Sequence, residues 1–534
     1  MNLIIIALMN LPVFEHTVSS LREYIRDESE SLQRVSELLK YDPGLYFSLL
    51  NYINSSTKRG DVTSISQAIS LVGAQGLEKF ILRQDEYLDE DYLLFWCYAA
   101  LAGETAVIIN EQVNIANEDE VFFAGILPSI GMLMMLIAHP RHKKIVELLL
   151  KLPVEQRIFI EEGLYKTNHI EQLDKNLSSP EIYRDIVSCM MKIYSKTGQR
   201  NKFTESPSKL SIAHKSFQMF RLVDTAGAAA RAILFPAVVE AQEKFSESAK
   251  AYFRIAENEI EELLSDVVLR FDSACKAFKM EGLFEKCTQR AASYVSPAVS
   301  FETKSKPLAK IVEGIYEANG EGRNIFIYGD SSVGKRLLAL SLHRRSDSAR
   351  KNKPLVSVHC AALDSDTFEM ELCGEKGCLL WVSKHKGALE MAEGGTLLLT
   401  DIDMIPLMQQ DSLAKMLTGD RFHMAGDAPP PVPNIQVLMT SRKDIVAEAK
   451  EGRFSDGLLK VLNPVCMYLP PLRERREDIE FIADEIIKKY ELNLNDPALR
   501  MGLRDYYETQ PFNDNLRDLK RFLFFLSAKN RLKS

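Results

Sequence analysis

The stretch Asn324–His343, "NIFIYGDSSVGKRLLALSLH", joins four apolar or aromatic residues to a glycine-bounded loop and then to a leucine-rich segment. This order predicts a strand, a phosphate-binding loop and a helix. In such a loop, backbone N–H groups and the helix N-terminus bind phosphate oxygens. The candidate nucleotide-binding residues are therefore Gly329, Asp330, Ser331, Ser332, Val333, Gly334, Lys335 and Arg336.

The residues at the end of the loop indicate which ligand we expect. Lys335 is placed to reach the terminal phosphates of ATP or ADP, the expected cofactor. The next position normally carries a serine or threonine that binds Mg²⁺, whereas Arg336 has no acceptor atom. We therefore expect nucleotide binding without a complete Mg²⁺ site, and the sequence contains no other predicted metal-ligand cluster.

The composition is that of a globular protein with several domains. The chain has 534 residues, of which 46% are hydrophobic and 26% are charged. A net charge of −8 argues against a mainly electrostatic nucleic-acid binder. Eight cysteines without regular spacing indicate reduced thiols. The opening "MNLIIIALMNLP" is too short for a spanning helix, and no other run is expected to be long enough, so we expect a cytoplasmic protein without membrane contact.

The pattern along the chain predicts four regions. Residues 1–205 show helical periodicity, residues 206–297 a helical linker, residues 298–470 alternating strands and helices, and residues 471–534 helices again. The fold class expected is an all-α domain, a linker, and an α/β P-loop domain with a parallel sheet and a small helical lid. The linker helices either bridge domains and self-associate, or pack on a neighbouring domain.

Four apolar runs mark the predicted strands of the sheet. They lie in "RNIFIYGD", "PLVSVHC", "GGTLLLTDID" and "NIQVLMTSR". Short runs of this kind, separated by helical stretches, are typical of parallel strands with crossover connections.

The C-terminal part resembles the AAA+ domain of the sigma-54-dependent bacterial enhancer-binding proteins. "VSVHCAALDSDTFEMELCGEKG", "HKGALEMAEGGTLLLTDID", "YLPPLRERREDI" and "QPFNDNLRDL" follow the family's order and spacing, from about residue 298 onward. The resemblance implies an ATP-binding domain that assembles with copies of itself. It also implies that Arg517, within "NLRDL", is the lid residue that contacts nucleotide.

The departures from this family fall on its catalytic carboxylates. The family has Asp-Glu after an apolar strand, where the Asp serves Mg²⁺ and the Glu activates water. Aligned on "EGGTLLL", these positions are Thr400 and Asp401, and a register shift of one makes them Asp401 and Ile402. One carboxylate is lost either way, with Asp403 nearby. The candidate catalytic residues, Asp401 and Asp403, are therefore not expected to support efficient hydrolysis.

The family's arginine fingers are also replaced. The matching positions in "GRFSDGLLKVLN" are Ser455 and Val461, with Arg453 two residues before the first of them. The polar sensor after the next strand is Arg442. Neither serine nor valine stabilises charge on a transferring phosphoryl group.

Two expectations concern contacts made by the AAA+ region. The family's sigma-factor loop, GAFTGA, corresponds to "GCLLWV" at Gly377–Val382, with Leu380 at the threonine position. These apolar residues either pack into the domain or form a different partner contact. No helix-turn-helix follows "NLRDLKRF" before Ser534, so we expect no direct DNA binding.

The N-terminal part resembles the HDOD domain, a helical relative of the HD-type metal phosphohydrolases. The matching stretches are "LLKYDPGLYFSLLNYINSS", "VTSISQAISLVGAQGLEKFIL" and "VFFAGILPSIGML". At the HD positions stand Pro128 and Ser129, with Tyr98 at an upstream ligand position, so we expect no metal site.

The remaining histidines of this region are expected to be unremarkable. His169 could survive from the metal-binding pattern, yet a single histidine is expected to be a surface or core residue. His139 and His142, in "AHPRHKK", are expected in a solvated helix start or loop.

Together these features predict a bacterial signalling protein that acts by binding and assembly. The expected partners are other copies of the chain or an AAA+ homologue. Three alternatives remain: an active ATPase that uses Asp401, Asp403 and Arg453; a transcription regulator that acts through a DNA-binding partner or a cyclic-dinucleotide signal; and a scaffold indifferent to nucleotides.

Overall fold

The chain forms two compact units in a computed structural model. One unit contains Met1–Ser296 and Phe525–Ser534, and the other contains Pro297–Phe524. The structure describes residues 11–26, 32–56, 62–82, 87–88, 93–177, 180–194, 214–236, 238–253, 255, 257–277, 301–346, 350, 353–360, 368–373, 387–418, 434–494 and 497–533.

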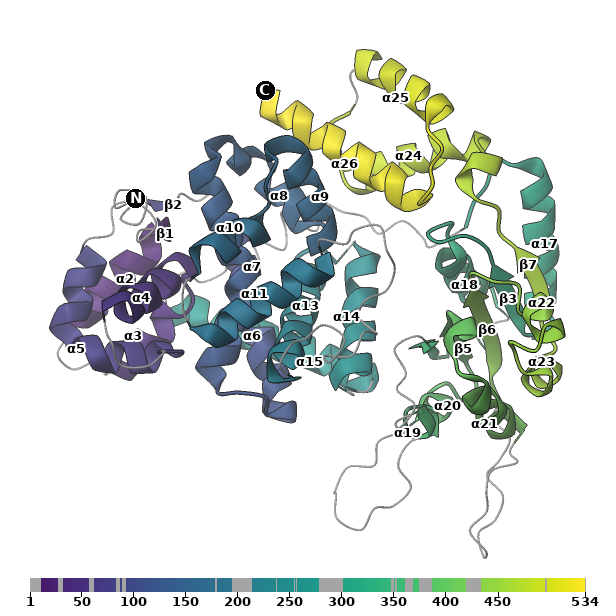
Figure 1. Cartoon of the computed structure of the whole chain (residues 1–534), viewed down its shortest axis with the longest axis horizontal. Helices are drawn as coiled ribbons and strands as arrows, with labels where there is room; N and C mark the ends of the chain where they lie inside the picture. Colours follow the sequence, from purple (N-terminus) through teal and green to yellow (C-terminus); the bar gives the residue numbers. More distant parts are fainter. Residues whose placement is uncertain are drawn as a thin grey trace, which may run out of the picture. The chain divides into compact units, whose positions relative to one another are not determined.

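The first unit is a bundle of helices (Figure 1). They are α2 (Glu15–Arg26), α3 (Leu32–Leu39), α4 (Pro43–Ser56), α5 (Ile65–Leu82), α6 (Leu93–Val113), α7 (Glu118–Ala138), η2 (Pro140–Ile145), α8 (Val146–Leu150), α9 (Val154–Tyr165), α10 (His169–Asn176), α11 (Glu181–Tyr194), α13 (His214–Leu234), α14 (Val239–Phe253) and α15 (Glu257–Ala277).

Helices α6 and α7 are the core of this unit and pack closely on one another. A Cβ atom added at Gly103 would lie 2.6 Å from the ring of Phe122, and one at Gly125 would lie 2.8 Å from the Ala102 carbonyl oxygen. Glycine is therefore required where the two helices cross. The carboxylate of Glu104, also buried, accepts a hydrogen bond of 2.6 Å from the Tyr41 hydroxyl.

The expectation that no further segment is long and apolar enough to span a membrane is wrong, because two helices meet both criteria. Helices α6 and α7 are each 21 residues long, with mean hydropathies of 1.5 and 2.3 in their most apolar windows. Of those windows, 94% and 89% is buried inside the unit. Such burial is typical of the core helices of a folded domain, whose apolar residues contact other helices on all sides.

Helices α13 and α15 both pack against α6, and α14 packs against α13. Phe217, Phe220 and Phe271 are fully or almost fully buried in these contacts. Of the two alternatives for these helices, the structure shows the second: they pack on the neighbouring helical domain.

The described part of this unit departs from an all-helical pattern at one point. Strands β1 (Val13–Phe14) and β2 (Tyr87–Leu88) form a parallel pair of two residues each. A pair this short leaves no alternation in the sequence, which is why the pattern gave no strand here.

The second unit contains a parallel sheet of five strands in the order β4-β5-β6-β3-β7. The strands are β3 (Ile325–Tyr328), β4 (Leu355–His359), β5 (Thr396–Thr400), β6 (Gln436–Ser441) and β7 (Val465–Tyr468). The first four confirm the strands predicted from the sequence. The edge strand β7 was not predicted.

Helices and 3₁₀ turns accompany this sheet (Figure 1). They are α17 (Lys306–Gly320), α18 (Lys335–Arg344), α19 (Phe368–Cys373), α20 (Ala388–Met391), η5 (Ile402–Met404), α21 (Leu407–Thr418), α22 (Ile445–Lys450), α23 (Asp456–Leu462), η6 (Leu472–Glu474), α24 (Glu477–Lys489), α25 (Pro497–Thr509) and α26 (Leu516–Lys533). From Phe525 onward, α26 belongs to the first unit.

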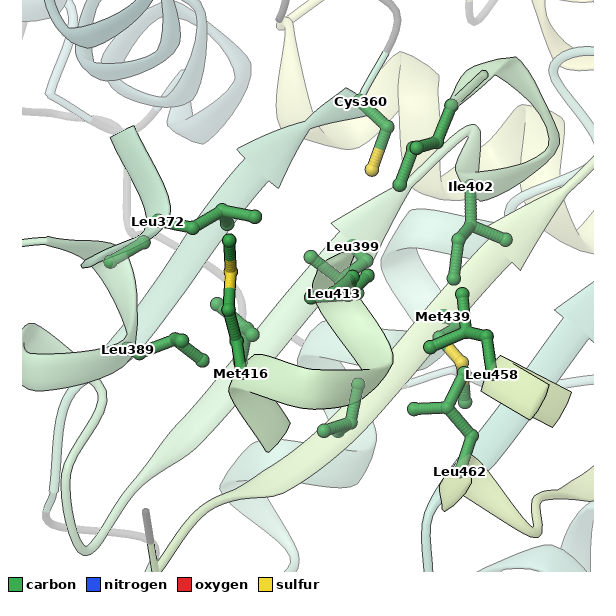
Figure 2. Close-up of a cluster of buried hydrophobic side chains, with 14 of the residues drawn as sticks. Cys360, Leu372, Leu389, Leu399, Ile402, Leu413, Met416, Met439, Leu458 and Leu462 are labelled. Atoms are coloured by element: carbon green, nitrogen blue, oxygen red, sulfur yellow. The ribbon is translucent and has the colours of Figure 1, made fainter. Parts of the chain in front are cut away.

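The sheet has a core on each face because neighbouring side chains of a strand point to opposite sides. Leu399 and Met439 belong to one core, where Figure 2 shows them with Leu413 of α21 and Leu458 of α23. Leu398 lies in the other core, with side chains of α17 and α18. This α/β/α layering brings the carboxyl ends of β3, β5 and β6 to one edge of the sheet, where ligands bind in such folds.

Candidate functional site

The loop between β3 and α18 has a backbone that only glycine can adopt at two positions. Gly329 has a φ of +149°, and a Cβ atom there would lie 2.3 Å from the Leu469 carbonyl oxygen. Gly334 has a φ of +105° and immediately precedes α18. The predicted strand, loop and helix therefore occur as expected, with Gly329–Arg336 in one continuous element.

Lys335 is the first residue of α18, and its side chain folds back over the loop. Its Nζ donates hydrogen bonds of 2.8 Å to the Gly329 carbonyl and 2.7 Å to the Asp330 carbonyl. Burial lowers the pKa of Lys335 to about 8, although Asp401 nearby favours the charged form. An anion bound in the loop would add a countercharge and raise this pKa again.

The carboxyl end of β5 brings both candidate carboxylates into the electrostatic environment of Lys335. Asp401 and Asp403 each favour its protonated form, whereas Arg442, which follows β6, disfavours it. Asp401 has a φ of +53°, an uncommon left-handed conformation for a residue other than glycine. Asp403 accepts a hydrogen bond of 2.8 Å from the Ser441 hydroxyl. Both carboxylates thus lie within electrostatic reach of Lys335, and their catalytic role stays a prediction.

Thr400 ends β5, and Asp401 is the residue that starts the following 3₁₀ turn. The Thr400 hydroxyl donates a hydrogen bond of 3.4 Å to the Val358 carbonyl of the neighbouring strand β4. A hydroxyl therefore ends the strand, directly before Asp401, and which of the two takes the position of the family's metal-binding carboxylate depends on the register.

In the segment where the resemblance implies arginine fingers, Ser455 and Arg453 both form hydrogen bonds within this unit. Ser455 is the N-cap of α23: its Oγ accepts from the Leu458 N–H at 3.2 Å and donates to Asp411 at 2.6 Å. Arg453 binds Glu448 of α22 through hydrogen bonds of 2.7 and 2.9 Å, and also pairs with Glu451. The nearest arginine to the finger positions is thus engaged within its own chain.

Arg517, the remaining nucleotide-binding candidate, lies in the first turn of α26. Its guanidinium is 3.0 Å from the Asp514 carboxylate, and its side chain is half exposed. The segment "GCLLWV" at Gly377–Val382 lies outside the described residues, so its predicted contacts remain predictions.

In the helical unit, the three positions that depart from the HD pattern are all buried. Tyr98 of α6 accepts a hydrogen bond of 3.0 Å from Arg157, which is fully buried and lies over the tyrosine ring. Pro128 and Ser129 lie inside α7. In the described part of the chain, no group of three or more His, Cys, Asp or Glu side chains is arranged to hold a metal ion.

The expectation of a solvated His142 is wrong. His142, Glu161 and His169 are fully buried together: Glu161 lies 2.6 Å from His169 Nδ1 and 3.4 Å from His142 Nε2. Pro140 starts the 3₁₀ turn η2, which directs His142 inward toward α9. The neighbouring lysines gave no sign of this, because the partner carboxylate lies 19 positions away along the chain.

The charges in this buried cluster follow from its geometry. Burial lowers the pKa of His142 to about 4, so this ring is neutral at pH 7. Burial alone would raise the pKa of Glu161, but the adjacent His169 and His142 lower it. His169 is therefore a core histidine, one of the two locations expected from the sequence.

Comparison with known proteins finds one family match in each of the two units. Residues 11–171 match the HDOD domain, and residues 301–467 match the sigma-54 interaction domain. The chain is 30% identical over 226 residues to the alginate biosynthesis transcriptional regulatory protein AlgB of Pseudomonas aeruginosa, covering 42% of this chain and 50% of that protein. It is 36% identical over 169 residues to the regulatory protein AtoC of Escherichia coli, covering 31% of this chain and 36% of that protein.

Solved structures with a similar AAA+ region include NtrX from Brucella abortus in complex with ADP. The matched region is 50% of this chain and 59% of the NtrX chain, with a TM-score of 0.38 and 22% sequence identity. The chain spans half or less of the length of the two curated relatives named above. The chain thus joins an N-terminal HDOD domain to an AAA+ domain of the sigma-54 interaction type.

Proposed function

We propose that this chain is a cytoplasmic regulatory protein whose AAA+ domain binds ATP or ADP and acts through assembly with protein partners, with little or no hydrolysis. The observation that carries this proposal is the phosphate loop. Its two positive-φ glycines and the inward-folded Lys335 retain the features that bind phosphate. The relatives' names, which describe regulatory proteins, support a regulatory role.

The proposal of weak hydrolysis follows from the groups opposite the loop. In one register Thr400 replaces the metal-binding carboxylate, and in the other Ile402 replaces the water-activating one; in both, Ser455 caps a helix where the resemblance implies an arginine. An arginine at such a position contributes about 10³–10⁵ in rate where it has been measured. The loss of both groups is therefore expected to leave bound nucleotide intact for long periods.

We propose that the HDOD domain has a binding or signalling role without metal-dependent catalysis. Tyr98, Pro128 and Ser129 stand where the resemblance implies metal ligands; all three are buried, and the Tyr98 hydroxyl accepts a hydrogen bond from Arg157. The partners proposed for the whole protein are copies of itself or an AAA+ homologue, because the resemblance implies an AAA+ domain that assembles with copies of itself.

The direct test is calorimetric titration of the purified chain with ATP and with ADP, each with and without Mg²⁺. We expect binding that falls about 30-fold or more in Lys335→Ala, because charge-assisted contacts to phosphate are lost. Lys310→Ala, an exposed lysine of α17, is the matched control and should bind normally. An unchanged affinity in Lys335→Ala would contradict the proposal.

A second candidate is an active ATPase with relocated catalytic groups. The observation that favours it is the position of Asp401 and Asp403, both of which act on Lys335. Against it stands Arg453, whose guanidinium is bound by Glu448 and Glu451. Phosphate release that disappears in Lys335→Ala would support this candidate over the first.

A further inference from the structure

Three consecutive carbonyl groups of the phosphate loop accept hydrogen bonds from the C-terminal part of the same unit. The Ser331 carbonyl accepts from Asn515 Nδ2 at 2.9 Å, and the Ser332 carbonyl accepts from the Leu516 N–H at 3.1 Å. The Val333 carbonyl accepts from the Arg475 guanidinium. The donors come from two places in the chain, the end of η6 and the start of α26.

These bonds determine which way the loop's N–H groups point. In a trans peptide, the C=O of one residue and the N–H of the next are directed to opposite sides. Holding the carbonyls of Ser331, Ser332 and Val333 on one side therefore turns the following N–H groups to the other. Successive N–H groups that converge in this way form an anion-binding concavity.

Both polar atoms of the Asn515 side-chain amide form hydrogen bonds in this contact. Its Nδ2 donates to the Ser331 carbonyl, and its Oδ1 accepts from the Leu472 N–H at 2.8 Å. The residue is fully buried and has a φ of +50°. Asparagine is one of the few residues that adopts this conformation readily. Asn515 therefore links η6 to the loop at the point where α26 begins.

Arg475 provides the second connection and is itself held firmly. Its side chain is 1% exposed, and it also donates to the Pro470 carbonyl at 3.1 Å and contacts Asp478 at 3.4 Å. Asp478 is fully buried and accepts from the Thr303 hydroxyl and from the Ser305 N–H. The loop is therefore attached to a rigid base of buried polar groups.

We propose that Asn515 is a positioning residue: it sets the phosphate loop in its anion-binding arrangement and couples nucleotide binding to the lid helices. The proposal builds on nucleotide binding at Lys335 and adds the route by which the bound nucleotide acts on the lid. A phosphate held by the loop's N–H groups stabilises the same peptide groups that Asn515 and Leu516 bind. Nucleotide and lid contacts therefore strengthen one another.

The test uses the full chain and two variants of Asn515. Asn515→Asp keeps the acceptor for Leu472 and tolerates a positive φ, but loses the donor to Ser331. Asn515→Gly also tolerates the positive φ and removes the side chain without adding charge. We expect each variant to weaken ATP binding about tenfold, and to speed hydrogen exchange in residues 329–335 of the free protein. Asn463→Asp is the control, because Asn463 also has a positive φ but caps α23.

A second readout separates positioning from general stability. ATP should slow hydrogen exchange at the start of α26 in the unaltered chain and in Asn463→Asp, and should do so far less in the Asn515 variants at matched saturation. Unchanged exchange in residues 329–335 and unchanged ATP affinity in both Asn515 variants would overturn the proposal. If the unaltered chain binds no ATP, nucleotide binding itself fails, and exchange in the free protein still decides whether Asn515 sets the loop.

Discussion

Gly329 and Gly334 keep the phosphate loop in a conformation that no other residue adopts easily, whereas the proposed loss of catalytic groups concerns Thr400 or Ile402 near the end of β5 and Ser455 at the start of α23. The phosphate loop and the positions of the expected catalytic groups thus differ in how strongly the fold determines which residues they carry. The loop is part of the fold, because its glycines contact Leu469 and its carbonyls contact the lid. The proposed function therefore assigns binding to the part of the site that also supports the fold.

The largest effect is expected when the loop's backbone is changed. Gly329→Ala places a Cβ atom 2.3 Å from the Leu469 carbonyl oxygen, at a φ that alanine rarely adopts. We expect the α/β unit to lose about 3–5 kcal/mol of stability and ATP binding to disappear. Urea denaturation and calorimetry measure both.

The matched control for this change is Gly314→Ala. Gly314 lies within α17, and an added Cβ atom there has no neighbour within 4 Å. Alanine should stabilise this helix by about 0.5–1 kcal/mol. Equal stability of Gly329→Ala and Gly314→Ala would show that the loop does not stabilise the fold. It would contradict the contrast between the loop and the catalytic positions.

A second comparison contrasts the phosphate loop with the buried His142–Glu161–His169 cluster of the HDOD domain. The pKa of His142 is about 4 in the folded unit, against 6.5 for an unperturbed histidine. As the pH falls, His142 is therefore protonated in the unfolded chain at a higher pH than in the folded chain. The stability linked to His142 is fully present above pH 6.5 and is lost as the pH falls toward 4, a loss of about 3 kcal/mol.

Glu161 changes stability in the same direction. Its lowered pKa gives a contribution that is present above pH 4.5 and is lost on further acidification. The measurement is denaturation at pH values from about 7.5 down to about 3.5, followed by the fluorescence of buried Trp96 in a Trp381→Phe background. His142→Leu should flatten this dependence, and an equally steep pH profile in that variant would contradict the assignment.

The smallest effect is expected at the replaced finger position. Ser455→Ala removes the side-chain cap of α23 and should cost about 1 kcal/mol of stability in the α/β unit. Phosphate release from ATP should not change, because the hydroxyl has a structural role. A fall in phosphate release at unchanged nucleotide affinity would instead place Ser455 in the chemistry.

The sequence predicted the parts of the fold that follow from local pattern. The apolar run before Gly329, the glycine spacing and the leucine-rich segment after Lys335 predicted β3, the loop and α18. Strand β7 was missed because Val465–Tyr468 is an edge strand with alternately exposed residues, too short to show a period. Pairing with β3 determines it, and that contact is distant in sequence.

The candidate site was predicted less completely. Asp401 and Asp403 could be placed near Lys335, because parallel strands bring their carboxyl ends to one edge. The roles of Arg475 and Asn515 could not be predicted, although both lie in segments that resemble the AAA+ family, because each depends on contacts with loop carbonyls more than 140 residues away. His142 was misplaced for the same reason, since its contacts with Glu161 and Tyr165 come from residues distant in sequence.

The central claim is that the chain binds nucleotide and leaves it intact. The most direct measurement is the fate of bound ATP: the full chain is mixed in excess with a trace of ATP and Mg²⁺, and the nucleotide is recovered and identified over several hours. The account predicts that ATP is recovered unchanged, and that Lys335→Ala, whose affinity is about 30-fold or more lower, retains far less of it. Conversion to ADP and phosphate at a rate that vanishes in Lys335→Ala would contradict the account.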